Sequence, residues 1–489
     1  MNIHKGNNNM KMRNIILVSI SLFLGACSLT PLQNKAKTPK TMASKNELKQ
    51  HLIYIDKNGD LIDPYTKKVI KNEDDYVNEI LKTFENSSTN KLTIFIHGGL
   101  NTYQNATKKA NQILKYYDQD KDSYILVIGW QAGPFTNYLD HLFFVRGGER
   151  RKIVGPLTSP FILVEDVARS VANAPRATID AGMTQFTLPI RRQTGEEKAY
   201  GDALDRLFAA KEFNVNASGH VRGLTYKDIV GYANPVKFGT APFVDGFGRG
   251  TWNSLSRRTE LLISKDSAFA KNENSKTALH KFLDQVDSSP STPEITLIGH
   301  SMGTMVANNI LIRKPTLNYK NIVYMAAAAS LKDVESNVVP FLKQDKNLHF
   351  YGLSLNPYRE IAESNVYDTV PRGSLLIWID TYLTSVKSFT EKTSGNFFNM
   401  IRAAETIFPS SVRNQVHLTM FGFRSKTDKN EKYGPQIHGE FDEYKFWDAN
   451  FWIADQECGL YFMDEEIKDT ALKEKCRQKD VNEKNRKTF

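Results

Sequence analysis

Cysteine is scarce in this sequence, since only Cys27, Cys458 and Cys476 occur among its 489 residues. Three cysteines are too few for a fold that depends on several disulfides, and their spacing does not match a structural zinc site. The scarcity therefore excludes the small disulfide-rich and zinc-binding classes of protein. It leaves one cysteine near the amino terminus and a possible pair, Cys458 and Cys476, near the carboxyl end.

Two other features are also missing. The longest apolar run near the amino terminus, residues 15–24, is shorter than the roughly 20 residues that cross a bilayer as a helix. No dense cluster of Lys and Arg with interleaved aromatic residues is present, so nucleic acid is not an expected partner. The formal net charge of +10 is then either a solvated basic surface or an attraction to anionic lipid headgroups or acidic substrates.

The amino terminus has the pattern of an export signal. Residues 5–13 are basic and polar, residues 15–24 are apolar, and Leu24-Gly25-Ala26-Cys27 follows. This tetrapeptide resembles the lipobox of bacterial lipoproteins. The resemblance implies a signal peptide over residues 1–26, cleavage before Cys27, and lipid attached to Cys27 that anchors the chain to a membrane. Ser28 stands where an Asp would favour the inner membrane, so we expect an outer-membrane location if the organism has one.

Composition divides the rest of the chain into segments. Residues 27–50 are polar and are predicted to form a flexible tether between the lipid and the domain. Residues 456–489 are highly charged and are predicted to form a peripheral tail. In an extracytoplasmic compartment, Cys458 and Cys476 could persist as a disulfide, or they could be two separate thiols.

Between these ends the pattern is that of an α/β protein. Apolar strands are predicted at 91–96, 124–128, 294–298, 321–325, 348–354 and 415–421, with helices at about 104–117 and 302–313. Continuous apolar strands alternating with helices indicate a mostly parallel sheet covered on both faces. We assign 51–130 and 291–455 to this core, 131–290 to a cap or lid insertion, and about 365–410 to a shorter helical insertion.

The strongest chemical signal is Gly299-His300-Ser301-Met302-Gly303, which follows an apolar strand and opens a helix. A serine on such a sharp turn is pushed away from the sheet, and the flanking glycines allow strand and helix to approach closely. The helix amino terminus directs N–H groups and a positive dipole toward a developing oxyanion. Ser301 is therefore the candidate nucleophile. His300 is predicted to support the turn rather than to act as the base.

A second signal, Ile94-Phe95-Ile96-His97-Gly98-Gly99-Leu100, ends an earlier strand. Acyl transfer needs at least two donors directed at the tetrahedral oxyanion. We predict one donor at the N–H of Met302 and the other at Gly99 or Leu100. His97 is expected to brace this loop.

These two motifs, in this order and context, resemble the α/β-hydrolase superfamily, including lipase-like members with a GHSMG turn. The resemblance covers roughly residues 90–360 and 415–455. It implies an α/β-hydrolase fold with large helical cap insertions, and a catalytic triad in the chain order Ser, acid, His. It also implies a covalent acyl-enzyme intermediate, which needs no metal and no organic cofactor.

His438 is the candidate base because it follows the last predicted strand and lies in a glycine-bearing loop. His349 and His417 fall at or inside strands and are poorer candidates. The acid is less well marked, because no Asp follows the strand at 348–354. Glu360 is the first choice, and the alternatives are Asp333, Glu363 and Asn356.

We therefore expect a lipid-anchored serine hydrolase that cleaves small-molecule or lipid carboxylic esters. An acyltransferase or amidase using the same site is a close alternative. A non-catalytic envelope lipoprotein on a hydrolase scaffold is an alternative of a different class, because fold alone does not dictate function.

Overall fold

The computed structural model describes residues 45–99, 103–117, 122–146, 149–194, 212–217, 234–265, 276–364, 368–421, 434–453 and residue 474. Cys27, Cys458, Cys476 and Leu100 lie outside the described residues, as does nearly all of the predicted 456–489 tail.

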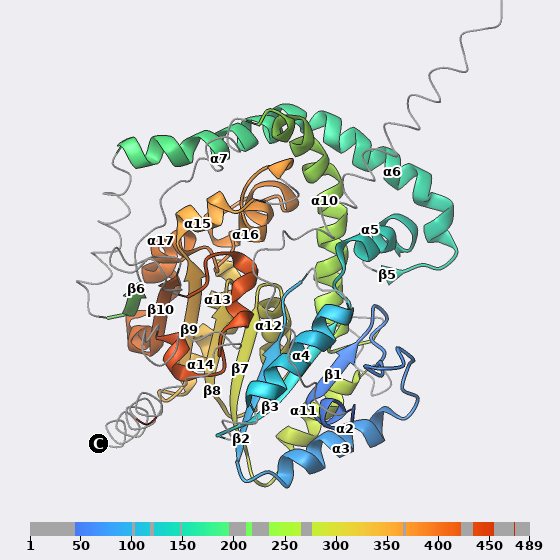
Figure 1. Ribbon diagram of the computed structural model, residues 1–489, viewed down its shortest axis with the longest axis vertical. Helices are drawn as coiled ribbons and strands as arrows, with labels where there is room; N and C mark the ends of the chain where they lie inside the picture. Colours follow the sequence, from blue (N-terminus) through green and yellow to red (C-terminus); the bar gives the residue numbers. More distant parts are fainter. Residues whose placement is uncertain are drawn as a thin grey trace, which may run out of the picture.

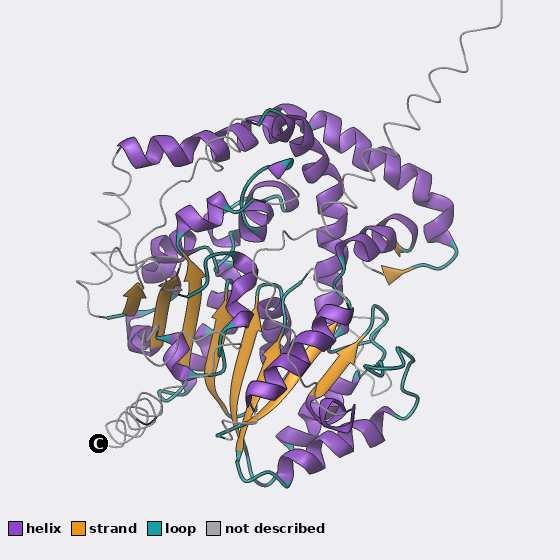
Figure 2. Cartoon of the chain, in the orientation of Figure 1, coloured by secondary structure: helices purple, strands orange, loops and turns teal. Residues whose placement is uncertain are grey.

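A single eight-stranded sheet forms the centre of the molecule, and all of its strand pairs are parallel. Its spatial order is β1-β3-β2-β7-β8-β9-β10-β6. The strands are β1 (Leu52–Ile55), β2 (Lys91–Ile96), β3 (Tyr124–Trp130), β6 (Asn214–Ala217), β7 (Glu294–His300), β8 (Tyr319–Met325), β9 (His349–Leu355) and β10 (Val416–Phe421). The predicted α/β class and all six predicted strands are confirmed, and helices lie on both faces of the sheet (Figure 2).

The sheet is buried because its strands are apolar on both faces. Every residue of β3 is buried, as are five of the six residues of β2. Parallel strands of this kind are stable only when helices cover both sides. Most of the covering helices are short. They are α3 (Glu73–Glu85), α4 (Tyr103–Tyr117), α11 (Ala278–Asp287), α12 (Gly303–Arg313), α13 (Leu331–Asn337), α14 (Val339–Gln344), α17 (Phe397–Ile407) and α18 (Ala449–Trp452).

The segment between β3 and β7 contains the three longest helices described, which are α6 (Val154–Ala172), α7 (Ala174–Thr194) and α10 (Val236–Leu261). It also contains the shorter α5 (Pro134–Phe143) and a small hairpin of β4 (Val145–Arg146) and β5 (Glu149–Arg150). Figure 1 shows α6 and α7 as an arch across the top of the molecule, with α10 running from the arch down beside the sheet. Helix α10 packs against α5, α6 and α7.

Two parts of this segment belong to the core rather than to a cap. Strand β6 pairs in parallel with β10 at the edge of the main sheet, and α11 packs against α3 and β1. The predicted cap boundaries of 131–290 are therefore too wide. The reason is that both elements have apolar residues that the core buries, including Val215 and Phe282.

A shorter insertion follows β9 and covers the carboxyl end of the sheet. It contains α15 (Pro357–Ala362), α16 (Leu375–Trp378) and a π-helical turn, η3 (Ile379–Leu383), and it leads into α17. The strand arrows in Figure 2 point toward this insertion, and α7 of the arch packs against α15.

The predicted tether of 27–50 is wrong at its carboxyl end. Residues from Lys45 form α2 (Lys45–His51), which packs against α3 and α4. Its Leu48 is fully buried. A single apolar side chain at the right position is enough to fix this short helix to the core, although the surrounding sequence is polar.

Candidate active site

Ser301 lies in the turn between β7 and α12, at the carboxyl edge of the sheet. Its backbone φ is +52°, a left-handed conformation that non-glycine residues rarely adopt. The turn is held by its own main chain, because Ser301 N–H donates to the Met325 carbonyl at 2.8 Å and Ala328 N–H donates to the Ser301 carbonyl at 3.1 Å. Strain of this kind persists only where the surrounding structure enforces it, and it is common at functional sites.

The glycines of the motif are required by the close approach of the elements. A Cβ on Gly303 would lie 2.3 Å from the carbonyl oxygen of Ile96 in β2. A Cβ on Gly299 would lie 2.8 Å from Cα of Thr304. Any larger residue at either position would push α12 away from the sheet, so the strand–turn–helix context predicted for the motif is present.

His438 lies beside Ser301, as the sequence predicted from chain order. Its Nε2 is 2.8 Å from Ser301 Oγ, and His438 opens a short 3-10 helix, η6 (His438–Glu443), after β10. Burial, together with the neighbouring His300, lowers the pKa of His438 to about 3. The ring is therefore neutral near pH 7, and Nε2 can accept the serine proton.

Among the hydrogen bonds of the described residues, Glu360, the first-choice acid, has none with His438. Glu360 is fully buried and its carboxylate accepts a hydrogen bond from the Ser374 hydroxyl. Burial raises the pKa of Glu360 to about 8. One carboxyl oxygen thus bonds Ser374, the residue that caps α16, and the other, Oε1, is buried without a hydrogen-bond partner among the described residues.

Glu363, an alternative acid from the sequence, contacts the histidine. Its Oε2 accepts a hydrogen bond from the backbone N–H of His438 at 2.9 Å. Burial raises the pKa of Glu363 to about 7, although the hydrogen bond from His438 and the charge of Arg359 oppose that rise. Within the described residues, Nδ1 of His438 is buried and has no hydrogen-bond partner. Glu363 is thus the candidate acid that the structure brings to the histidine.

The other two candidates for the acid position, Asp333 and Asn356, form hydrogen bonds with residues other than His438. Asp333 completes a capping box with Ser330 at the start of α13, where each side chain bonds the other's backbone N–H. Asn356 is buried, and its backbone N–H donates to the carbonyl of Phe421. Both residues stabilise local structure.

A charged network behind the histidine was not predicted. Lys109 of α4 forms an ion pair with Asp442 at 2.9 Å and also donates to the Asp442 carbonyl at 2.9 Å. Burial would raise the pKa of Asp442, but the charge and hydrogen bond of Lys109, together with His300 and His97, hold the pKa below its ordinary value. The Asp442 carboxylate lies 3.7 Å from Nδ1 of His300.

His300 joins this network to the catalytic candidates. Its Nε2 lies 3.0 Å from the carbonyl oxygen of His438 and donates to it in the matching tautomer. His300 is therefore a support for the loop that carries His438, as its position in the motif predicted. Asp442 lies four residues after His438, and that proximity was the available sequence signal for it. Lys109 is 333 residues away from Asp442 and has no local signal.

The loop after β2 lies against the serine turn. A Cβ on Gly98 would be 3.0 Å from Cβ of Ser301, and a Cβ on Gly99 would be 2.5 Å from Sδ of Met302. Met302 is the N-cap of α12, so its N–H has no acceptor within that helix. The predicted oxyanion residues Gly99 and Met302 therefore adjoin Ser301, whereas Leu100 falls outside the described residues.

His97 braces the same loop. Its Nδ1 lies 2.6 Å from the Gly98 carbonyl, and its Nε2 accepts from Trp130 N–H at 3.1 Å. Burial lowers the pKa of His97 to about 4, so the ring stays neutral and keeps both bonds. His349 and His417 contact each other on β9 and β10 and do not reach Ser301 among the hydrogen bonds of the described residues.

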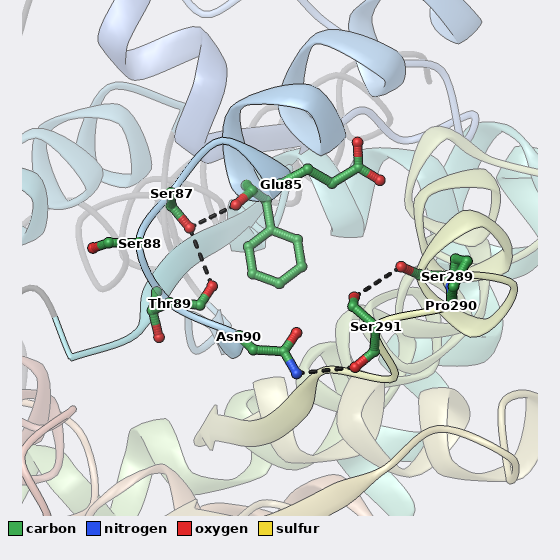
Figure 3. A pocket seen from close by; sticks show the side chains of 9 residues that line it. Glu85, Ser87, Ser88, Thr89, Asn90, Ser289, Pro290 and Ser291 are labelled. Carbon is green, nitrogen blue, oxygen red and sulfur yellow. Dashed lines mark hydrogen bonds between the residues drawn. The ribbon is translucent and has the colours of Figure 1, made fainter.

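A surface pocket elsewhere is not part of this site. Figure 3 shows it lined by Phe84, Glu85, Ser87, Ser88, Thr89, Asn90, Ser289, Pro290 and Ser291. These residues precede β2 and β7, so the pocket lies at the amino edge of the sheet, opposite the edge that carries Ser301. Its polar groups bond one another, for example Asn90 Nδ2 to the Ser291 carbonyl at 2.9 Å.

In the described part of the chain, no group of three or more His, Cys, Asp or Glu side chains is arranged to hold a metal ion. None of the helices described is long and apolar enough to span a bilayer.

Comparison with known proteins finds a similarity over a short part of the chain. A family model described as "Alpha/beta hydrolase of unknown function (DUF900)" matches residues 249–338. This stretch includes the end of α10, the serine turn and β8, but not His438. No curated protein and no solved structure matches the chain. The fold is that of an α/β hydrolase, with a parallel sheet and large helical insertions.

Proposed function

We propose that this protein is a serine hydrolase that cleaves carboxylic esters, with Ser301 as the nucleophile, His438 as the base and Glu363 as the acid. The observation that carries the proposal is the 2.8 Å contact between Ser301 Oγ and Nε2 of a neutral, buried histidine. A serine hydroxyl beside a base is the arrangement that converts it into a nucleophile. The left-handed turn at Ser301 and the similarity to a hydrolase family support the same reaction class.

The first half-reaction acylates the serine. Nε2 of His438 removes the Ser301 proton as Oγ bonds to the carbonyl carbon, whose oxygen becomes negatively charged. The N–H groups of Gly99 and Met302 are proposed to receive that charge. The bond to the leaving alcohol then breaks, and the alcohol oxygen takes the proton from Nε2.

The second half-reaction uses water in place of the alcohol. Nε2 of His438 removes a proton from water as its oxygen attacks the acyl carbon. The bond to Oγ breaks, the carboxylic acid leaves, and Ser301 regains its proton. In each half-reaction Nε2 takes up one proton and then returns it, and no metal or organic cofactor enters the proposed cycle.

Glu363 is assigned as the acid because of tautomer chemistry. When Nε2 accepts from serine, the neutral ring carries its proton on Nδ1. Among the described residues, that Nδ1–H lacks an acceptor. The Glu363 carboxylate already accepts a hydrogen bond from the backbone N–H of His438. In the reactive state the Glu363 carboxylate is proposed to accept from Nδ1–H as well as from this backbone N–H. It would then orient the ring and stabilise its charged form.

The substrate is proposed to be a small-molecule or lipid ester at a membrane. Ser301 is 2% exposed and His438 is 8% exposed, so the serine is covered by neighbouring elements and an ester must be admitted from outside. The expected lipid on Cys27 would place the protein in the cell envelope, beside lipid esters.

The test is covalent labelling with a fluorophosphonate probe. The folded protein should be labelled at Ser301, and the Ser301→Ala variant should not be labelled. An unlabelled native protein would overturn the proposal and favour a non-catalytic envelope lipoprotein. If labelling occurs, product analysis with added alcohols or amines separates hydrolysis from acyl transfer, and an amide substrate tests for amidase activity.

A further inference from the structure

Helix α6 carries an apolar stripe on its outer face. Its members are spaced three, four or seven residues apart, so they share one side of the helix. They are exposed to an unusual degree: Ile153 77%, Leu157 73%, Phe161 76%, Val164 67% and Val171 70%. The stripe continues onto α7 through Ile179 and Met183, which are 64% and 60% exposed.

The inner face of the same helix is small and polar. Gly155, Ser159, Asp166 and Ser170 are its buried residues. Asp166 accepts a hydrogen bond from Tyr138 at 3.2 Å and lies 3.3 Å from Nε2 of His141. A surface helix ordinarily buries its apolar side and exposes its polar side, so α6 has the opposite arrangement.

The packing holds this orientation in place. A Cβ on Gly155 would lie 2.4 Å from the Phe143 carbonyl, and a Cβ on Gly246 of α10 would lie 1.8 Å from Oγ of Ser170. The small residues therefore let α5 and α10 approach α6 closely. Turning the helix to bury its stripe would break these contacts and those of Asp166. The outward apolar face is consequently a built feature of the arch.

The composition around the stripe favours a lipid surface as its partner. Lys152 is exposed at its beginning, next to Arg151, which is exposed and pairs with Glu149. Arg176 lies between the α6 and α7 parts of the stripe, with 48% of its side chain exposed, and pairs with Asp245 at 2.9 Å. Cations that flank an aliphatic stripe are attracted to anionic headgroups while the stripe enters the acyl boundary. Seventeen residues separate Cys27 from Lys45, a chain that reaches at most about 60 Å when extended. A lipid on Cys27 would therefore keep the domain close to a bilayer.

We propose that the outer face of α6 and the start of α7 dock on a lipid bilayer, with Leu157 and Phe161 inserted at the headgroup–acyl boundary. Figure 1 shows the arch beyond the carboxyl edge of the sheet, the edge that carries Ser301. Docking through the arch would turn this edge toward the membrane. Docking on a bilayer is a property separate from ester hydrolysis, and its test needs no catalytic readout.

The experiment uses the full chain reconstituted in vesicles of phosphatidylethanolamine and phosphatidylglycerol with brominated acyl chains, which quench tryptophan on contact. Leu157→Trp and Phe161→Trp are each compared with the unsubstituted protein, whose five tryptophans give the background. The matched control is Ile312→Trp, because Ile312 is 58% exposed near the end of α12, away from the arch. We expect the added emission to be quenched several-fold more at positions 157 and 161 than at position 312.

Two results would overturn the inference. One is equal quenching at all three positions, which would mean that the lipid anchor alone brings the chain to the vesicle. The other is an added emission at 157 that is shifted to shorter wavelength without lipid and depends on protein concentration, which would mean that a second copy of the chain covers the stripe. Circular dichroism of each variant establishes that the fold is retained. Failure of serine labelling would not affect either readout, so the two proposals are tested separately.

Discussion

At the residue scale, Glu363 and Glu360 separate two roles that sequence alone could not distinguish. Glu363→Gln keeps the size of the side chain but removes the negative charge beside His438. We expect kcat to fall by about 10³- to 10⁴-fold, the loss typical of a triad acid converted to its amide. The matched control is Glu360→Gln, which should change kcat little because the Glu360 carboxylate bonds Ser374. The measurement is ester hydrolysis by both variants, and the opposite ranking would restore Glu360 as the acid.

The pH dependence of the rate follows from the same two groups. Burial lowers the pKa of His438 to about 3 and raises that of Glu363 to about 7. His438 is then already neutral across the ordinary range, whereas Glu363 gains its charge only as the pH rises through about 7. Because the charged carboxylate stabilises the imidazolium, kcat/KM should rise with pH to a plateau above that value. A profile with its midpoint near pH 4 would contradict this assignment, and Glu363→Gln should lack the step.

The sequence predicted the residues whose chemistry depends on short-range patterns. Ser301 was found because strand, turn and helix are contiguous, and His438 because chain order places it after the last strand. Glu363 was an alternative only, since a helical turn after β9 carries two glutamates and their directions depend on packing. Asp442 was missed because its role depends on Lys109, which lies 333 residues earlier in the chain. Side-chain direction and distant pairing are properties of the tertiary structure.

At the element scale, the serine turn depends on the space around Gly303. Gly303→Ala would place a methyl group 2.3 Å from the Ile96 carbonyl, so β2 and α12 would have to separate. We expect the free energy of unfolding to fall by about 1–3 kcal/mol, as for other overpacked sites, and serine labelling to slow. Chemical denaturation measures the first effect, and the rate of fluorophosphonate labelling measures the second.

The control for this substitution is Gly239→Ala in α10, where a Cβ would meet nothing within 4 Å. Alanine is the better helix former by about 1 kcal/mol, so this variant should be as stable as the parent or more stable. Equal destabilisation by the two substitutions would show that close packing at the turn is not the cause.

Long apolar strands were predictable, and the short edge strand β6 was not. Strands β2, β3 and β7 are continuous apolar runs, which a parallel sheet buries on both faces. Strand β6 has four residues and pairs only with β10, at one edge of the sheet. Helix α2 was interpreted as tether because its sequence is polar and only Leu48 is fully buried. Elements this short are fixed by the surface they pack on.

At the scale of the whole molecule, the site is assembled from both halves of the chain. Lys109 on α4 and Asp442 after β10 join the amino-terminal half of the sheet to the loop that carries His438. Asp442 is 5% exposed, so its carboxylate depends on this partner. Breaking a buried ion pair by removing one partner typically costs about 3–5 kcal/mol, because the remaining charge stays buried. The loop holding the base is thus coupled to the stability of the whole fold.

Lys109→Met tests this coupling. We expect a loss of about 3 kcal/mol in the free energy of unfolding, and a lower rate of Ser301 labelling even at temperatures where the variant is folded. Adding Asp442→Asn should recover much of the stability, because the unpaired charge is removed, but it should not restore the labelling rate. Lys108→Met, on the same helix, is the control and should stay within about 0.5 kcal/mol of the parent. A Lys109→Met variant that labels at the parent rate would show that the ion pair stabilises the fold without positioning His438.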